Sequence, residues 1–490
     1  MKLADILKDV DCKYDAKYSN LEIKNIRHNS QQIEEGSLFI AIKGHTVDGH
    51  RFIQNAIENG AVAVIGEWDV EKIGNIQIAY IQVESSESIL ADISSAFFEK
   101  PSESLDVFGI TGTNGKTTTS YLLKYVLESK QSNVGLIGTT GCVIDGVMEK
   151  SSNTTPDALV LQSIFNRMVK SQAKSCVMEV SSHALKLERV KNTNYKIGIF
   201  TNLTPEHLDF HPNMEDYYLT KKKLFEMTSL ANIINTDDSY GKRLVNEINN
   251  RVPLYSYGIE EEADFRAINI ENRVEGLKYT VKTPEGNYLV EMKIAGRVNI
   301  YNSLAVIAAA YSYGYDMMHI IEALQKAENV PGRFEFVETN DDYHVLIDYA
   351  HTPDGYEKLF STVNEFAKGR KIALFGCGGD RDGVKRPVMG EIAAQNCDLV
   401  ILTTDNPRTE NPDKIVEDIL IGIKKANGNY LFIEDRKEAI EYAIENHQPN
   451  DLIMLIGKGH ERYQIIGHEK HYFNEREIVE TYIQRLKGEK

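Results

Sequence analysis

The sequence has no apolar run of membrane-spanning length, few cysteines and no excess of basic residues. The missing run argues against a transmembrane helix, and the charged, amphipathic segment 1–9 is unlike a signal peptide. A net charge of −17 argues against nucleic acids and anionic membrane surfaces as partners. The five cysteines are scattered without metal-ligand spacing, so we expect a reduced, cytoplasmic location.

A chain of 490 residues is too long for one hydrophobic core and should fold as two to four domains. Apolar residues make up 42% of the chain and charged residues 26%, which is ordinary for a soluble protein. We find no internal repeat and no long low-complexity segment. The composition therefore predicts a soluble multidomain protein.

Residues 107–118 have the pattern of a phosphate-binding loop between a strand and a helix. Gly112 and Gly115 let backbone N–H groups close around a phosphate, Lys116 can reach terminal phosphates, and the Thr117 hydroxyl can ligate Mg²⁺. The helix N-terminus adds partial positive charge. One position departs from the general form, because Ile110 stands where most such loops have glycine. The loop predicts binding of a nucleoside triphosphate and transfer or cleavage of its terminal phosphate.

Strand and helix patterns divide the chain into three predicted α/β domains. We expect a small α/β domain over residues 1–98, a central P-loop domain with a parallel sheet over 99–331, and a Rossmann-like domain over 332–490. Apolar strands separated by helices favour parallel sheets covered on both faces. The expected strands are 36–42 and 61–65 in the first domain, 134–140, 175–180, 196–201 and 231–236 in the second, and 345–347, 372–375, 399–402, 430–433 and 452–456 in the third.

Two helices are predicted from local signals. One should begin near Thr155, with that residue as N-cap and Pro156 at the first helical position. The other should span 214–225, where helical spacing puts Lys221 in the middle of the apolar face and Lys223 opposite. A buried lysine has a lowered pKa, and a neutral amine can add CO₂ to become a carbamate, an oxygen ligand for Mg²⁺. A side chain that reaches back to solvent is the alternative.

Polar residues follow six predicted strands at their carboxyl ends, where open α/β sheets bind ligands. Since these ends belong to two domains, we expect one composite site formed between them. The residues are Glu179, Ser181 and His183; Asn202 and His207; Asp348 and His351; Asp380 and Arg381; Asp405 to Arg408; and Gly457 to Glu461.

Segments spread over nearly the whole chain match the motifs of one enzyme family. They are 111–118, 153–156, 178–183, 201–209, 296–302, 331–333, 348–351, 376–382, 405–408 and 457–461. Together they resemble the Mur ligase family, ATP-dependent amide-forming enzymes of peptidoglycan synthesis, in which Ile110 is the usual residue. Segments 153–156, 376–382, 405–408 and 457–461 are similar to the members that add 2,6-diaminopimelate.

The resemblance implies that ATP phosphorylates the D-glutamyl γ-carboxylate of UDP-N-acetylmuramoyl-L-alanyl-D-glutamate. The amine of meso-2,6-diaminopimelate then attacks the acyl phosphate, and phosphate leaves. Two Mg²⁺ ions are implied as well, one held by Thr117 and Glu179, the other by His207 and Lys221 as a carbamate (N6-carboxylysine). Together with Lys116, the residues Glu179, His207 and Lys221 are the expected catalytic set.

The resemblance also assigns each substrate to a domain and to a set of residues. The first domain would bind the UDP-muramoyl group, the central domain ATP, and the C-terminal domain the incoming amino acid, in a protein that we expect to be a monomer. The ATP set is Gly112, Thr113, Asn114, Gly115, Lys116, Thr117, Thr118, Asn299, Asn302, Arg333, Asp348 and His351. The UDP-muramoyl-dipeptide set is Ser30, His45, Asn153, Thr154, Thr155, Ser181 and Arg189. The diaminopimelate set is Arg381, Asp405, Asn406, Pro407, Arg408, Gly457 and Glu461.

Arg408 has a physical reason for its place in the last set. Diaminopimelate differs from lysine by one extra carboxylate, which a planar guanidinium can bind with two parallel hydrogen bonds. Taken alone, residues 405–408 would predict no more than a turn. Their position after a predicted strand favours the functional interpretation.

Other functions are consistent with parts of the pattern. A ligase for another amino acid or a folylpolyglutamate-type enzyme would share the phosphate loop. A P-loop kinase has little need for a second Rossmann-like domain with a carboxylate clamp. A non-catalytic nucleotide switch is disfavoured by Lys116, Thr117, Glu179 and His207. ATP hydrolysis that depends on an amine acceptor would separate a ligase from a kinase.

Overall fold

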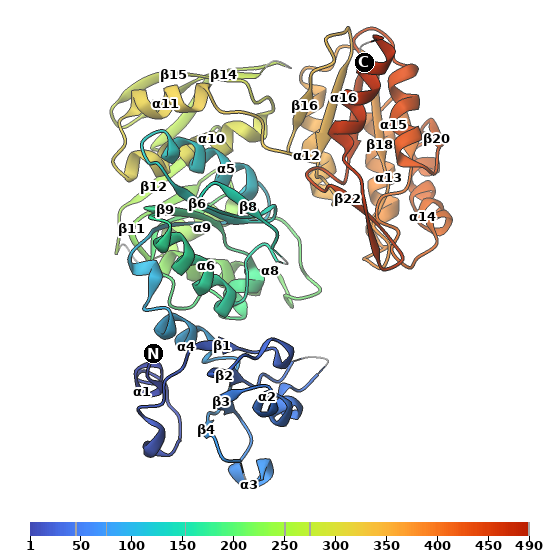
Figure 1. Cartoon of the computed structure of the whole chain (residues 1–490). Helices are drawn as coiled ribbons and strands as arrows, with labels where there is room; N and C mark the ends of the chain where they lie inside the picture. The colour runs from blue at the N-terminus through green and yellow to red at the C-terminus, as the bar shows by residue number, and fades with distance from the viewer. Residues whose placement is uncertain (45–46, 75, 152, 249–250, 274–275, 489–490) are drawn as a thin grey trace.

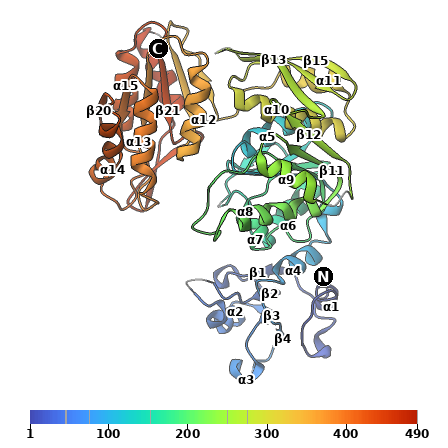
Figure 2. The same ribbon diagram turned by 180° about the vertical axis from the view of Figure 1, so that it is seen from behind.

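The chain forms three parts in sequence order, each built around its own sheet (Figure 1). The computed structural model describes residues 1–490 except 45–46, 75, 152, 249–250, 274–275 and 489–490. The N-terminal part lies at one end of the central part, and the C-terminal part lies beside it, as the reverse view also shows (Figure 2). Within the described residues, no helix is both long and apolar enough to cross a membrane.

The N-terminal part has a parallel four-stranded sheet in the order β1-β2-β3-β4. Its last helix, α4, packs on helix α6 of the central part, and Asp92 of α4 accepts hydrogen bonds from Lys191 (2.9 Å) and Asn192 (2.7 Å). The elements are α1 (Leu3–Ile6), β1 (Asn25–Arg27), β2 (Ser37–Ile40), α2 (Ile53–Glu58), β3 (Ala61–Gly66), α3 (Val70–Ile73), β4 (Ala79–Gln82) and α4 (Leu90–Phe97).

The central part is an eleven-stranded sheet in the order β15-β14-β13-β12-β11-β10-β5-β9-β6-β7-β8. Strand β5 pairs in parallel with β9 and β10, so three carboxyl ends meet beside the phosphate loop. The strands are β5 (Asp106–Thr111), β6 (Val134–Gly138), β7 (Gly141–Ile144), β8 (Val147–Glu149), β9 (Ser175–Glu179), β10 (Tyr195–Phe200), β11 (Thr228–Asn235), β12 (Leu254–Gly258), β13 (Phe265–Arg273), β14 (Gly276–Thr283) and β15 (Gly286–Met292). The helices are α5 (Lys116–Glu128), α6 (Ala158–Lys170), α7 (Ser182–Lys186), α8 (Met214–Lys222), α9 (Ser239–Glu247), α10 (Arg297–Ser312) and α11 (Met317–Gln325).

Two features of the central part differ from the sequence-based expectation. Antiparallel pairs form at both edges of the sheet, among β13, β14 and β15 at one and among β6, β7 and β8 at the other, where parallel strands alternating with helices were expected. Helix α6 is capped by Asp157, whose carboxylate accepts from Val160 N at 3.0 Å, so the predicted start at Thr155 is wrong. The reason is that the Thr155 hydroxyl donates to Glu179 O (2.8 Å) and accepts from Ser181 N (3.1 Å).

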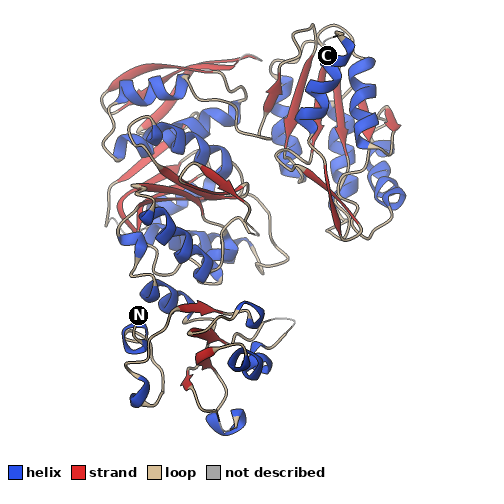
Figure 3. Ribbon diagram, viewed as in Figure 1, coloured by secondary structure: helices blue, strands red, loops and turns tan. Residues whose placement is uncertain are grey.

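The C-terminal part has a six-stranded sheet in the order β16-β17-β21-β18-β19-β20, parallel except for β16 (Figure 3). Alternate strand residues face opposite sides: Leu346 packs with helices α12–α14, whereas Val345 and Ile347 pack with α15 and α16. This burial on both faces explains the unbroken apolar strands. The elements are β16 (Glu335–Val337), β17 (His344–Asp348), α12 (Pro353–Asn364), β18 (Lys371–Phe375), α13 (Lys385–Asn396), β19 (Leu399–Leu402), α14 (Pro412–Lys425), β20 (Tyr430–Phe432), α15 (Arg436–Glu445), β21 (Leu452–Ile456), the hairpin β22 (Tyr463–Ile466) and β23 (Glu469–Tyr472), and α16 (Glu475–Leu486).

Candidate functional site

The phosphate loop joins β5 to α5 and depends on its two glycines. Gly112 has φ +149° and Gly115 has φ +85°, in the region that side chains disfavour. A Cβ at Gly112 would lie 1.9 Å from Thr201 Oγ1, and one at Gly115 would lie 2.6 Å from Asn302 Oδ1. The backbone can therefore close into a phosphate cradle only with glycine at both positions.

A cavity of about 230 Å³ opens beside this loop and collects most of the expected catalytic residues. Residues from the C-terminal part line one side of it, so the site lies between two parts of the chain as expected from the strand ends. The lining residues are Gly112 to Thr118, Thr139, Thr154, Glu179, Ser181, Ser182, Glu206, His207, Tyr217, Lys221, Arg333, Tyr349 and His351.

Lys221 is buried on the inner face of α8, with 2% of its surface exposed, while Lys223 is exposed. The prediction that Lys221 lies in the apolar face is confirmed. Its Nζ donates to Gly112 O at 2.9 Å and lies 4.8 Å from the centre of the Tyr217 ring. Burial, with the neighbouring Lys116 as a second cause, holds the pKa of Lys221 well below its usual value.

Lys116 begins α5 and folds back onto its own loop. Its Nζ donates to Gly112 O at 3.0 Å and to Thr113 O at 2.7 Å. Burial lowers the pKa of Lys116, an effect opposed by the carboxylates of Glu206 and Glu179. An ammonium held by loop carbonyls is well placed to turn toward a phosphate.

Glu179 ends β9 and is almost fully buried. One carboxylate oxygen accepts from Thr139 N at 2.9 Å, and the other accepts from Thr139 Oγ1 at 3.0 Å. An ionised carboxylate can accept about four hydrogen bonds or ligand contacts. Glu179 therefore keeps capacity to ligate a cation.

His207 follows β10 in a loop and has an unusual backbone, with φ +57°. Its side chain is 43% exposed and lies 4.9 Å from the His183 ring, measured between ring centres. Burial lowers the pKa of His207, as do Lys116 and Lys221, while Glu206 opposes the shift. A neutral imidazole is the form that binds metals.

The oxygen donors in this cavity suit Mg²⁺, since Thr117 offers a hydroxyl and Glu179 a carboxylate, and the imidazole of His207 lies in the same cavity. Glu179 and His207 do not form a ready-made cluster with a third acidic or imidazole ligand. Among the described residues, one set of three such side chains brings its ligand atoms within 4.8 Å of one another, and it lies at the surface of the C-terminal part: Asp341, Asp342 and His447.

Arg333, from the segment that joins the central and C-terminal parts, donates from Nη2 to Thr117 Oγ1 at 3.3 Å. Its guanidinium carbon lies 4.6 Å from the centre of the Tyr349 ring, and that ring lies 4.9 Å from the His460 ring. A chain of contacts thus links the phosphate loop to segment 457–461, which was expected to bind the incoming amino acid.

Asp354 makes a second bridge between the parts that the sequence analysis missed. From the first turn of α12, its carboxylate accepts from Asn114 Nδ2 at 2.8 Å and Thr204 Oγ1 at 3.1 Å. Its position three residues after His351 was the available signal, because it follows the same strand end.

The other expected ATP residues surround a neighbouring cavity of about 100 Å³. Asn302 accepts at Oδ1 from Thr119 and donates to Asn299, which holds α10 against α5. The Asp348 carboxylate accepts from the backbone N–H of Phe334 (2.8 Å) and of Ala350 (2.8 Å), and burial raises its pKa. His351 is exposed and lines the larger cavity.

The expected UDP-muramoyl-dipeptide residues are divided between two parts. Thr154, Thr155 and Ser181 lie where β6 and β9 end, with Thr154 Oγ1 3.2 Å from Thr139 Oγ1. Arg189 donates to Thr155 O at 3.5 Å. The structure places Asn153 next to Thr154, puts Ser30 buried in the N-terminal part, and leaves His45 outside the described residues.

A second polar cluster lies at the carboxyl ends of β19 and β21, and we name it the acceptor cluster: Asn406, Arg408, Lys458 and Glu461. Asn406 Nδ2 donates to Glu461 Oε2 at 2.8 Å, and Lys458 Nζ donates to Asn406 Oδ1 at 3.2 Å. Arg408 has φ +50° and donates from Nη1 to Gly379 O at 2.9 Å. Among the described residues its Nη2 has no partner, so one donor group of the guanidinium is available to a ligand.

The remaining expected diaminopimelate residues adjoin this cluster, though none lines the phosphate-loop cavity. A Cβ at Gly457 would lie 3.1 Å from Asp405 Oδ2, and one at Gly378 would lie 3.0 Å from Arg408 Nη1 and 3.7 Å from Arg381 Cγ. Pro407 O faces Gly379, where a Cβ would clash at 1.9 Å. Gly378 and Gly379 therefore allow the loop after β18 to lie close to the loop after β19, which carries Pro407 and Arg408.

Arg386 is a buried residue that the sequence analysis missed. Its guanidinium donates to Glu410 at 2.7 Å, to Asp418 at 2.9 Å and to Gly378 O at 3.2 Å. It thereby ties the loop after β18 to the loop after β19, which carries Arg408. Its nearness to Arg381 in the sequence was the only available signal.

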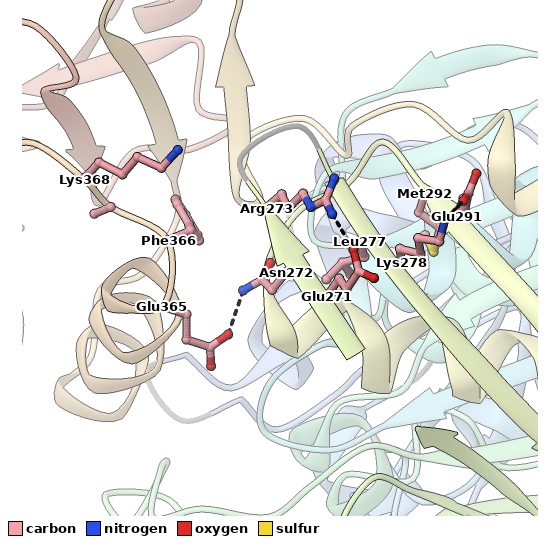
Figure 4. Close-up of a pocket in the computed structure, with 12 residues that line it drawn as sticks. Glu271, Asn272, Arg273, Leu277, Lys278, Glu291, Met292, Glu365, Phe366 and Lys368 are labelled. Atoms are coloured by element: carbon pink, nitrogen blue, oxygen red, sulfur yellow. Dashed lines mark hydrogen bonds and ion pairs between the residues drawn. The ribbon is translucent and has the colours of Figure 1, made fainter. Parts of the chain in front are cut away.

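A larger cavity, of about 870 Å³, lies between strands β13–β15 and the end of α12 (Figure 4). Two ion pairs of the central part line it: Arg273 pairs with Glu271, and Lys278 pairs with Glu291. One hydrogen bond crosses it, from Asn272 Nδ2 to Glu365 Oε2 at 2.8 Å. This cavity shares no residue with the phosphate-loop cavity, and it separates the two parts at their outer edge.

Family models match three stretches of the chain. The model described as Mur ligase family, catalytic domain, matches residues 22–98. The Mur ligase middle domain matches residues 110–310, and the Mur ligase, glutamate ligase domain, matches residues 332–459.

Curated relatives match at nearly full length. The UDP-N-acetylmuramoyl-L-alanyl-D-glutamate--2,6-diaminopimelate ligase of Clostridioides difficile (strain 630) is 44% identical over 488 residues, which cover 99% of this chain and 100% of that protein. The protein of the same name from Caldanaerobacter subterraneus subsp. tengcongensis is 45% identical over 480 residues, 98% of each chain. A solved structure of a ligase of that name aligns over 99% of both chains with a TM-score of 0.73 and 29% identity. This chain therefore belongs to the Mur ligase family.

Proposed function

We propose that the chain is an ATP-dependent ligase that joins 2,6-diaminopimelate to the D-glutamyl γ-carboxylate of UDP-N-acetylmuramoyl-L-alanyl-D-glutamate. The observation that carries this proposal is the phosphate-loop cavity, in which the loop, Glu179, His207 and Lys221 face residues of the C-terminal part. The names of the relatives with 44% and 45% identity support the choice of substrates.

In the first step, the γ-carboxylate of the dipeptide attacks the γ-phosphorus of ATP, and ADP leaves. The proposed cradle for the triphosphate is Gly112 to Thr118, and Lys116 turns from its loop carbonyls toward the phosphates. Since α5 begins at Lys116, its N-terminus adds partial positive charge where phosphate charge accumulates. The product of this step is an acyl phosphate.

Mur ligases use ATP together with Mg²⁺, and the cavity offers suitable ligands. We propose two ions, one held by Thr117 and Glu179 and one by His207 and a carbamylated Lys221. The ions would offset negative charge on the triphosphate and on the acyl phosphate. Arg333 already donates to the Thr117 hydroxyl, whose second lone pair is available to a metal ion.

The proposed modification of Lys221 follows from its burial. A neutral Nζ attacks the carbon of dissolved CO₂, an N–C bond forms and one N–H proton leaves, which gives a carbamate anion. The low pKa of Lys221 makes the neutral amine available at moderate pH. The exchange of a buried cation for an anion also relieves its repulsion with Lys116.

In the second step, an amine of diaminopimelate attacks the acyl carbon and phosphate leaves. We propose that Arg408 binds the carboxylate that distinguishes this amino acid from lysine, with Asn406 and Glu461 beside it. The available Nη2 of Arg408 fits this role. Arg381, Asp405, Pro407 and Gly457 complete the proposed pocket.

The remaining assignments are part of the same proposal. Residues 1–98 bind the UDP-muramoyl group with Ser30 and His45, while Asn153, Thr154, Thr155, Ser181 and Arg189 hold the dipeptide. Residues 99–331 bind ATP, and residues 332–490 bind the incoming amino acid. The protein acts as a cytoplasmic monomer on these small molecules.

The decisive experiment is phosphate release from ATP in the presence of UDP-N-acetylmuramoyl-L-alanyl-D-glutamate, comparing meso-diaminopimelate with L-lysine. The expected result is phosphate release with diaminopimelate but not with lysine, with the tripeptide product identified by mass. Preference for lysine would support the assignment as a ligase but overturn the proposed role of Arg408. Phosphate release without any acceptor, or a phosphorylated sugar product, would replace the ligase with a hydrolase or a kinase.

A further inference from the structure

Lys458 lies in the loop after β21 and carries a charged amine into a site where none of its surface is exposed. Its Nζ donates to Asn406 Oδ1 at 3.2 Å and to Glu461 Oε2 at 3.4 Å. The ring centres of Tyr463 and Phe473 lie 6.0 and 5.9 Å from the same nitrogen. A buried charge is costly unless it is paired and hydrogen-bonded, so these two partners hold the lysine in place.

The same contacts fix the orientation of Asn406. Its Oδ1 accepts from Lys458 Nζ and from Ile465 N (2.9 Å), and its Nδ2 donates to Glu461 Oε2 at 2.8 Å. A flipped amide would place NH₂ against two donors and oxygen against a carboxylate. Lys458 therefore allows one orientation of the amide and holds the Glu461 carboxylate next to it.

We propose that Lys458 is the positioning residue of the acceptor cluster: it orients Asn406 and Glu461 so that, with Arg408, they receive the ammonium and carboxylate groups of the incoming diamino acid. This inference rests on the function proposed above. Since Lys458 is fully buried, it acts through Asn406 and Glu461 and does not touch the substrate itself.

The charges around the cluster support this role. Burial raises the pKa of Glu461, the nearby Asp405 adds to the rise, and Lys458 opposes it. The tyrosines Tyr349 and Tyr463 also face Glu461 and contribute no positive charge. Without Lys458, the Glu461 carboxylate would lose the cation that keeps it ionised beside Asp405, and its attraction for a substrate ammonium would fall.

The test is steady-state kinetics of Lys458→Met, which keeps the length of the side chain but removes its charge. We expect the KM for diaminopimelate to rise roughly tenfold to a hundredfold, as for the loss of a charged hydrogen bond, with little change in the KM for ATP. Lys458→Arg should recover part of the loss because it restores the charge. Lys470→Met is the matched control, since the exposed Lys470 also lies near the Tyr463 ring, at 4.3 Å from its centre, and its loss should leave every constant unchanged.

A double-mutant cycle with Glu461→Gln separates positioning from a general structural role. If Lys458 acts through Glu461, then Lys458→Met should add little to the KM for diaminopimelate in the Glu461→Gln background. Equal rises in the KM for diaminopimelate and for ATP, or additive effects in the cycle, would overturn the inference. Should Lys458→Met fail to fold, Lys458→Gln takes its place; it keeps a donor but removes the charge beside Glu461, so the KM for diaminopimelate should still rise, by less than in Lys458→Met. Absence of ligation by the wild-type protein would instead overturn the proposed function.

Discussion

Lys116 and Lys221 donate to one acceptor, the carbonyl oxygen of Gly112, at 3.0 and 2.9 Å. Two ammonium groups on one carbonyl repel each other, and this repulsion adds to burial in lowering the pKa of Lys221. In the proposed function, Lys116 would turn to phosphate and Lys221 would react with CO₂.

Replacement of Lys221 by methionine should therefore abolish activity without loss of stability. We expect kcat to fall roughly a hundredfold or more, comparable to removal of a charge-stabilising group, while the urea unfolding midpoint stays the same or rises because a buried cation is gone. Phosphate release and urea titrations measure the two effects. The exposed Lys223 is the control, and Lys223→Met should keep full activity.

Removal of dissolved CO₂ should also reduce the activity of the wild-type protein, and bicarbonate should restore it. The carbamate forms from the neutral amine, so at a fixed concentration of dissolved CO₂ the recovered activity should be lost at a pH low enough to protonate Lys221. Intact mass spectrometry of the native protein would detect the added CO₂ directly. Activity that is indifferent to CO₂ would count against the carbamate.

Arg408→Ala should raise the KM for diaminopimelate by about tenfold to a hundredfold, because a substrate carboxylate loses its guanidinium partner. The KM for ATP should change little, since Arg408 does not line the phosphate-loop cavity. Initial-rate kinetics with each substrate varied in turn will measure this. Arg273→Ala, at an exposed arginine paired with Glu271, is the control; parallel changes in both constants would refute the assignment.

Arg386→Leu should destabilise the C-terminal part by about 1.5–3 kcal/mol, because the partly exposed carboxylates of Glu410 and Asp418 lose their charged hydrogen-bond donor. The expected signature is a lower urea midpoint together with a higher KM for diaminopimelate, since the loops beside Arg408 lose their tie. Lys425→Leu removes an exposed pair with Glu391 and should leave the midpoint nearly unchanged. An unaltered midpoint in Arg386→Leu would show that the ion pairs of Arg386 with Glu410 and Asp418 do not stabilise the C-terminal part.

His460 should make the protein less stable as the pH falls. Burial, with Arg333 and His351 nearby, lowers the pKa of His460 to about 4, against about 6.5 in the unfolded chain. Between these values the unfolded chain binds a proton that the folded chain does not, so stability declines from pH 6.5 to pH 4 by roughly 3 kcal/mol. His460→Asn should flatten this part of the stability curve relative to the wild type, and identical slopes for the two proteins would contradict the prediction.

Local patterns in the sequence were enough for several features. The phosphate loop is recognisable from its glycines and Lys116, and the burial of Lys221 follows from helical spacing within α8. The phosphate loop and the burial of Lys221 depend on residues close together in the chain, so a short stretch of sequence is enough to predict them. The same holds for the strands of the C-terminal part, which are apolar on both faces.

Other features depend on contacts that no local pattern encodes. Thr155 was expected to cap α6, but its hydroxyl is engaged by Glu179 and Ser181. The roles of Arg386 and Lys458 depend in part on distant partners, Glu410 at 24 positions and Asn406 at 52 positions. Charged residues in polar segments normally indicate solvent, and only the folded chain shows that these two are buried.

The contact between Arg333 and Thr117 has a consequence for nucleotide binding. One hydroxyl serves the junction between two parts of the chain, and the same hydroxyl is needed by the nucleotide and its metal. A nucleotide whose metal binds the Thr117 hydroxyl would share that oxygen with Arg333, while the bridge from Asp354 to Asn114 and Thr204 would remain. The nucleotide site and the junction of the two parts thus share one oxygen atom, so a change at either is felt directly at the other.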